Sequence, residues 1–342
     1  MGSDMTRNNH IYFLYTLAAI TATALASCSR LNPEGLGSEE ISIRPFAKSH
    51  TKAIIEGTSY PDDETFGLWT FHTESTAGTS WAAGKGDTYT YLDNVAFHKN
   101  GQSWAGYDYA TLEHKPYYWP TYGSMFFAAY SPYALHEKVS YDKETGTFAL
   151  SEYTLDPDNY LDFMYAEIGD LDNSVFKVEK SMLFKHALSL IEFTAQLKNP
   201  DDAQYIDIHS ITTYPIPSSG SFTSRDAESQ QPQWIRNLTP EIALSICDAG
   251  QTSGVDNGYS LTANSKTILG KALVIPGNAV QIEIRYRIHY AEGKHLTEKY
   301  LIIPTDAVLA WEPGKKYSYH ITLGADFIEV MPSIGTDWNE IY

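Results

Sequence analysis

The chain has 342 residues, of which 43% are hydrophobic and 19% charged, a composition that excludes a disordered or low-complexity protein. Forty-two acidic and 24 basic residues give a formal net charge of -18, which disfavours nucleic-acid binding and electrostatic docking on anionic membranes. The length favours two domains, and the 25 tyrosines favour strands over helices.

The N-terminal segment carries the features of a lipoprotein signal peptide, predicted here as residues 1–27. Residues 11–26 are uncharged and largely apolar, but the stretch is shorter than a membrane-spanning helix requires. It ends in the sequence LASC at 25–28, which resembles a bacterial lipobox, so the Cys28 thiol is expected to accept a diacylglycerol. The alternative is an ordinary secretory signal with a cysteine there by chance. Residues 28–40 are polar and predict a tether between the lipid and the fold.

Alternation of apolar and polar residues dominates the rest of the chain and predicts an all-β fold. The clearest example is 280–290, with isoleucines and tyrosines on one face and Glu283, Arg285 and Arg287 on the other. A returning strand at 297–303 completes a hairpin, and 316–323 repeats the alternation. Further strands are expected at 66–71, 88–95, 125–130, 161–166 and 190–197. Short strands at this spacing indicate two β-sandwich domains, predicted at 41–173 and 174–342.

Catalytic and metal-binding motifs are hard to find in this sequence. It has no HExxH zinc pair, no phosphate loop and no GxSxG nucleophile elbow. The best calcium candidate is the acidic segment around Asp156, Asp158 and Asn159, with Asp162 and Glu167 following. Tyr160 and Leu161 stand where a calcium loop needs an oxygen ligand and a glycine, so an acidic turn is the preferred interpretation.

No enzyme, metal or cofactor is therefore predicted. Cys247 is interpreted as a small buried residue rather than a catalytic thiol. No local pattern selects a pair of carboxylates for glycoside hydrolysis, although such a pair is defined only in three dimensions.

An aromatic run at Tyr117, Tyr118 and Trp119 has Trp81, Trp104 and Tyr122 nearby in sequence. These rings either form a stacking platform for sugars or fill the core and rim of a sandwich, the interpretation we prefer. The platform would make the protein a monomeric glycan-binding lipoprotein.

Several segments together resemble the fimbrillin family of Bacteroidales, whose members are lipoprotein precursors of type V pilus subunits. The lipobox at Cys28 is one. The others, in order along the chain, are 41–45, 51–57, 66–71, 117–120, 126–132, 162–166, 184–189, 311–319 and 336–338.

The resemblance implies two tandem transthyretin-like β-sandwich domains and export to the outer membrane or cell surface, without enzymatic activity. It also implies that a trypsin-like protease removes the first strand, here Ile41 to Lys52, by cutting before Ala53. The vacated groove then takes a strand from the next subunit, head to tail. Family members usually have arginine at the cut position, whereas this chain has Lys52, and Arg44 precedes a proline. Either the protease accepts lysine, or the subunit stays anchored through Cys28.

The tail at 325–342 is the candidate donor strand, with Phe327, Val330, Ile334 and Trp338 as the residues that would fill a groove. Part of this segment can equally be the last strand of its own domain. A short remaining tail would favour a tip or anchor subunit over a stalk subunit. The expected partners are other fimbrial subunits, outer-membrane lipid through Cys28, and a host or bacterial surface ligand.

Overall fold

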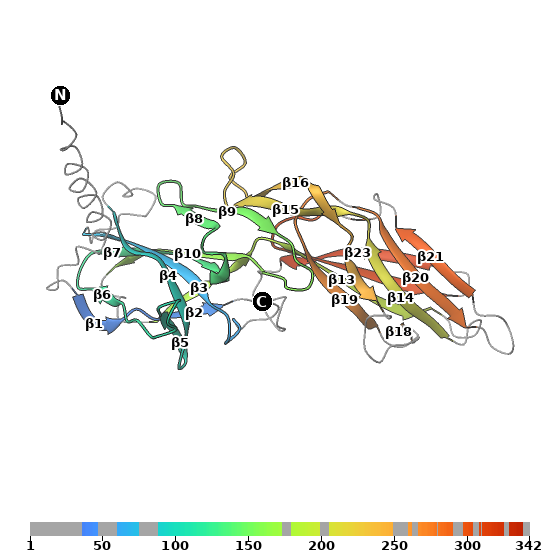
Figure 1. Ribbon diagram of the computed structural model, residues 1–342, viewed down its shortest axis with the longest axis horizontal. Coiled ribbons are helices and arrows are strands. Elements are labelled where there is room, and N and C mark those ends of the chain that lie inside the picture. The colour runs from blue at the N-terminus through green and yellow to red at the C-terminus, as the bar shows by residue number, and fades with distance from the viewer. Residues whose placement is uncertain are drawn as a thin grey trace, which may run out of the picture. The chain divides into compact units, whose positions relative to one another are not determined.

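Strands make up nearly all of the regular structure in the computed structural model of the chain (Figure 1). The structure describes residues 36–46, 60–74, 88–172, 179–198, 205–248, 259–261, 266–278, 280–289, 297–303, 308, 310–324 and 328–337. Within these ranges the only helical element is a three-residue 3-10 turn, Tyr133–Leu135. Residues 37–342 belong to one compact unit. The predicted all-β class is confirmed.

The first half of the chain builds an eight-stranded sheet with the order β11-β2-β5-β4-β3-β7-β10-β12. Its strands are β2 (Ile43–Phe46), β3 (Phe66–Thr73), β4 (Tyr89–Asn100), β5 (Ser103–Gly106), β7 (Ser124–Ser131), β10 (Met164–Asp172), β11 (Lys180–Leu183) and β12 (Lys185–His186). All neighbours in this sheet are antiparallel except β2 and β11, which run parallel. A separate two-stranded sheet joins β1 (Leu36–Glu40) to β6 (Tyr118–Pro120).

A four-stranded sheet packs on one face of the eight-stranded sheet. Its order is β16-β15-β9-β8, from β8 (Val139–Asp142), β9 (Thr147–Thr154), β15 (Ile216–Thr223) and β16 (Gln233–Ile242). Aromatic rings join the two sheets, since Phe148 lies 6.3 Å from Trp69 and Phe222 lies 5.5 Å from Tyr165 between ring centroids. Large interlocking rings of this kind bury much apolar area for each residue that is ordered.

Two further sheets form the sandwich of the second half. One has the order β19-β13-β22-β23, from β13 (Ser189–Leu197), β19 (Thr267–Val274), β22 (Lys315–Leu323) and β23 (Ile328–Asp337). The other has the order β17-β14-β20-β21, with β18 (Tyr259–Ser260) paired to β14 (Tyr205–Thr213); its remaining strands are β17 (Ser245–Asp248), β20 (Ile282–His289) and β21 (Thr297–Ile303). Their inward residues, among them Ile191, Phe193, Ile282 and Ile284, have no exposed surface.

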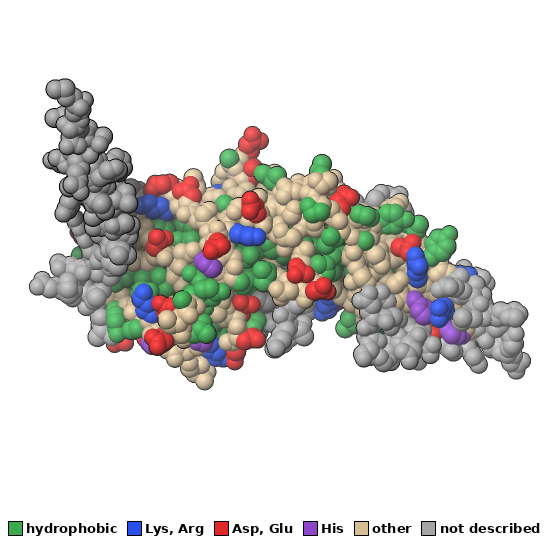
Figure 2. All heavy atoms as spheres, viewed as in Figure 1, with side chains coloured by type: hydrophobic (Ala, Val, Ile, Leu, Met, Phe, Trp, Pro, Cys, Tyr) green, Lys and Arg blue, Asp and Glu red, His purple; other side chains and the backbone are tan. Residues whose placement is uncertain are grey.

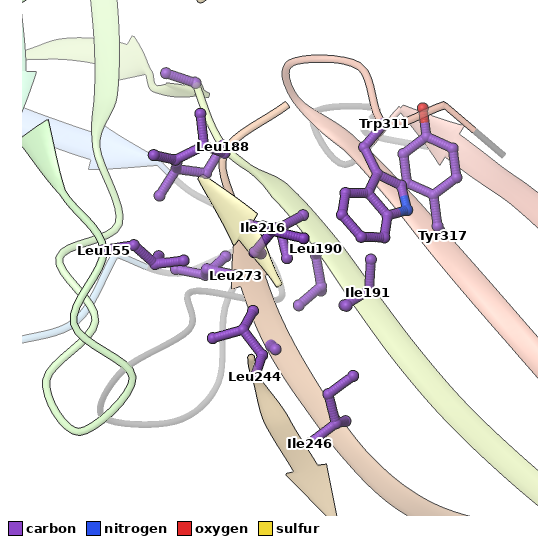
Figure 3. Close-up of a cluster of buried hydrophobic side chains, with 14 of the residues drawn as sticks. Leu155, Leu188, Leu190, Ile191, Ile216, Leu244, Ile246, Leu273, Trp311 and Tyr317 are labelled. Carbon is purple, nitrogen blue, oxygen red and sulfur yellow. The ribbon is translucent and has the colours of Figure 1, made fainter. Parts of the chain in front are cut away.

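One hydrophobic cluster runs through the sheets of both halves. Figure 3 shows part of it, where Leu155, which follows β9, lies near Ile216 of β15 and Leu273 of β19. All three are at most 3% exposed. The halves are therefore joined by shared apolar packing as well as by the β9–β15 ladder.

Most of the predicted strands are found close to their expected bounds, but the strand predicted at 161–166 is shifted, because β10 begins only at Met164 and runs to Asp172. The predicted strand at 297–303 coincides with β21, and the apolar face of 282–288 is buried as expected. The domain boundary at 173/174 stays a prediction, as do two tandem transthyretin-like domains. Two features bear on that boundary: β11 and β12 follow it yet complete the first sheet, and β9 pairs with β15 across it.

Candidate functional site

The short strand β2 occupies a slot inside the eight-stranded sheet. It pairs in parallel with β11 over four residues, from Ile43 opposite Lys180 to Phe46 opposite Leu183. On its other side it makes one pair with β5, Ile43 opposite Trp104. The N–H of Phe184 donates to the carbonyl of Phe46 at 2.9 Å and ends the ladder. Among the described residues, β2 is thus the only strand that joins β11 to the rest of this sheet's hydrogen-bonded order.

Residues on β2 and just before it alternate between the core and the surface. Ile41 and Ile43 have no exposed surface and Pro45 is buried, whereas Arg44 is exposed. The outward Arg44 forms an ion pair with Glu179 at 2.9 Å. Alternation of this kind in a sheet means that one face of the strand fills pockets while the other lies at the surface.

Aromatic side chains surround the buried face of the slot. Tyr60 is 3% exposed and lies edge-on to Trp104, with ring centroids 5.7 Å apart, and it also contacts Phe66 and Phe184. Its hydroxyl is 2.7 Å from the Ser131 hydroxyl. Burial, with a contribution from Glu64, raises the pKa of Tyr60, so the phenol stays neutral. Tyr60 thereby fixes the chain in the core immediately after the segment 47–59.

The start of β2 lies beside the aromatic run predicted from sequence. The N–H of Ile41 donates to the carbonyl of Tyr117 at 2.7 Å. Trp119 is only 2% exposed, packs on Phe127, and has the Lys180 ammonium 5.6 Å from its ring centroid. Burial lowers the pKa of Lys180. Within the run, Tyr117 is half-buried and Tyr118 is 37% exposed.

The candidate donor segment is an edge strand. In the described part of the chain, β23 pairs with β22 alone and lies at the end of its sheet's order. Its register places Ile328, Val330 and Ile334 opposite Leu323, Ile321 and Tyr317, whose side chains point into the core. Even so, Ile328 is 37% and Ile334 is 57% exposed, and Val330 is half-buried. β23 therefore presents an incompletely covered row of apolar side chains.

Several predicted site residues lie outside the described part of the chain. These are Cys28, Lys52, Ala53, Phe327 and Trp338. The lipidation and processing sites therefore stay predictions.

The carboxylates of the acidic segment after β9 contact protein groups. Asp156 accepts the N–H of Asp158 at 3.0 Å, and Glu167 accepts the Tyr141 hydroxyl at 2.8 Å. Asp162 forms a buried pair with His186 at 3.0 Å, where both side chains are at most 2% exposed. No group of three or more metal-ligand side chains is found among the described residues. Cys247 is 4% exposed.

Comparison with known proteins was made at three levels. A profile described as fimbrillin-like matches residues 51–338. The chain belongs to the fimbrillin-like family. No curated protein sequence matches it. A fimbrial protein from Bacteroides vulgatus has a similar structure, with 15% identity, 87% of this chain and 99% of the other covered, and a TM-score of 0.50.

Two further solved structures were compared. A protein from Bacteroides uniformis, provisionally described as a cell adhesion protein, has 16% identity, coverage of 87% and 99%, and a TM-score of 0.48. The tip fimbrial protein Mfa3 from Porphyromonas gingivalis has 10% identity, coverage of 86% and 98%, and a TM-score of 0.34.

The fimbrillin-like family is a family of structural fimbrial and adhesion proteins, and membership supports a fimbrial role at the cell surface for this chain. Within the described residues, no helix has the length and apolar character needed to cross a membrane. Sequence reasoning missed β11, which forms one wall of the slot. Buried and exposed residues alternate along β11, but an alternation over only four residues cannot be distinguished from chance in the sequence.

Proposed function

We propose that this protein is a fimbrial subunit or accessory component, made as a lipid-anchored precursor, that joins a neighbour by strand exchange once its first strand has been removed. In this scheme β2 and the segment after it are removed, and β23 of a second copy or a related subunit takes the slot. The proposal goes beyond family membership, because it assigns the leaving strand and the incoming strand to named residues.

One observation carries the proposal: β23 repeats the side-chain pattern of β2. The inward positions at the slot are Ile41, Ile43 and Pro45, spaced by two residues. β23 has Ile328, Val330 and Pro332 at the same spacing. A β-branched residue, another β-branched residue and a proline are thus matched in order. Because proline lacks an N–H, a slot that accepts Pro45 needs no donor there, and Pro332 supplies none.

The energetics favour refilling a vacated slot. Full burial of an isoleucine side chain is worth about 1.5–3 kcal/mol, so loss of Ile41 and Ile43 forfeits about 3–6 kcal/mol of apolar burial. β11 would also lose its ladder to β2, leaving unpaired backbone groups. An incoming strand with matching side chains restores both contributions, which is the basis of β-strand addition.

The predicted processing site fits this geometry. A cut between Lys52 and Ala53 would release β2 together with the lipid on Cys28, while Tyr60 stays buried in the core. Without the cut, the chain would remain attached through Cys28 and could act only as an anchor or accessory component. The mature N-terminus on the cell surface distinguishes the two roles.

The experiment uses purified full chain treated with a trypsin-like protease, and follows the formation of ladders of oligomers. Cleaved wild-type protein is expected to assemble, and Val330→Asp is expected to block assembly, because a charge would enter the pocket of Ile43. Met331→Asp is the matched control, since Met331 is 49% exposed and lies on the other face of the same strand.

Two results would contradict the proposal. A correctly cleaved protein that stays monomeric excludes self-exchange through this slot. Equal assembly of the two aspartate variants, each shown by circular dichroism to be folded, excludes the register proposed for β23.

A further inference from the structure

Exposed tyrosines gather at one end of the eight-stranded sheet, where β3 ends and β4 begins. Tyr89 begins β4, Tyr122 lies two residues before β7, and both are 44% exposed. Between them lies His72, near the end of β3 and only 1% exposed. Its ring lies 5.0 Å from Tyr89 and 5.7 Å from Tyr122 between centroids, and meets both edge-on.

Both tyrosine rings pack on the buried His72 ring, and further contacts fix the backbone beside Tyr122. His72 Nε2 is 2.7 Å from the Tyr122 carbonyl oxygen. Gly123 follows with a φ of +86°, and a Cβ there would lie 2.1 Å from the Thr73 carbonyl oxygen, so the turn requires glycine. Nearby, the Tyr91 hydroxyl donates to the Tyr118 carbonyl at 2.6 Å. Rings fixed before binding lose little conformational entropy when a ligand stacks on them.

The polar groups at this end of the sheet suit a neutral ligand with hydroxyl groups. Among the described residues His72 Nδ1 is buried and has no hydrogen-bond partner. The exposed Glu74 carboxylate lies near enough to interact electrostatically with both His72 and Tyr89. A carboxylate in a chain of net charge -18 repels anions but accepts hydrogen bonds from sugar hydroxyls. Figure 2 shows acidic side chains spread over the visible face of the protein.

We propose that Tyr89 and Tyr122, with Glu74 beside them, form a binding site for a neutral glycan. A pyranose ring would stack on an exposed tyrosine face, and its hydroxyls would bond the phenols and the carboxylate. The site differs from the platform predicted at Tyr117, Tyr118 and Trp119, because Trp119 is buried. It does not depend on strand exchange, so it is tested on the uncut chain.

The experiment measures binding of the full chain to immobilised neutral oligosaccharides ending in galactose, mannose, fucose or N-acetylglucosamine, with sialylated oligosaccharides as the charged comparison. At least one neutral glycan is expected to bind. Tyr89→Ala and Tyr122→Ala are each expected to weaken that binding at least tenfold, whereas Tyr122→Phe keeps the ring and most of the affinity. Tyr300→Ala is the matched control, since Tyr300 is 72% exposed but lies on β21 in the other half.

Absence of binding to every neutral glycan would overturn the proposal, and so would binding confined to sialylated glycans. Equal affinity of wild type and the folded Tyr89→Ala and Tyr122→Ala variants would place the glycan elsewhere and also overturn it. Thermal melting of each variant separates loss of the site from loss of the fold.

Discussion

Truncation of Ile43 tests whether β2 is a tightly packed part of the folded precursor. Ile43 has no exposed surface and lies opposite Trp104, so Ile43→Ala removes buried methyl groups and leaves a cavity. Such truncations cost about 2–5 kcal/mol. Arg44→Ala, at the next position, removes an ion pair whose side chains are 51% and 27% exposed, a change worth about 0–1 kcal/mol.

Urea unfolding followed by tryptophan fluorescence measures both variants, since Trp104 lies across the strand pair. The midpoint for Ile43→Ala is expected to fall well below that of wild type at an unchanged slope, while Arg44→Ala stays close to wild type. If the two variants lie within about 0.5 kcal/mol of each other, β2 is not packed as the structure indicates.

Two further predictions concern stability. Burial alone would raise the pKa of the Glu192 carboxyl. The ammonium groups of Lys271 and Lys316 lie 3.0 and 3.1 Å from its Oε2 atom and have the larger effect, so the pKa is lowered from its ordinary value of 4.5. The ionised Glu192 therefore stabilises the fold fully above the pKa of the unfolded chain. This stabilisation is lost as the pH falls through the lower pKa of the folded protein. Glu192→Gln should lose about 1–2 kcal/mol at pH 7, and the difference from wild type should shrink on acidification in a pH series of urea melts. Gly67→Ala would place a Cβ 2.2 Å from the buried Tyr130 ring, so thermal melting should show a loss of about 1–3 kcal/mol; an unchanged melting temperature would refute that packing.

Sequence patterns predicted the strands whose two faces differ most. β20 and β22 carry long runs of alternating residues, and both were found by that signal. Val330 and Ile334, two of the candidate donor residues, lie on one row of β23, and their role as a donor strand stays a prediction. Local alternation is sufficient wherever one face of a strand meets the core.

Other features could not be read from local patterns. β9 and β15 were not predicted, although they pair with each other across the predicted domain boundary. The pairing of β2 with β11 depends on segments far apart in sequence, and no short-range signal encodes it. The cluster of Tyr89 and Tyr122 was missed for the same reason, since only the register of β3 with its neighbours brings both rings to His72.

The parallel pairing of β13 with β22 has a consequence for the order of folding. Leu190 lies opposite Lys316, so the second sandwich cannot close until nearly the whole chain is present. A chain threaded through a membrane pore from its N-terminus would carry β13 without its parallel neighbour β22 until residue 323 had emerged, even after β19 had paired with its other edge. Closing so long a loop is slow, and the waiting apolar strand is prone to aggregate. The second sandwich of a chain of this topology would therefore close late, after most of the chain had become available, whereas the eight-stranded sheet of residues 43–186 depends on no later strand.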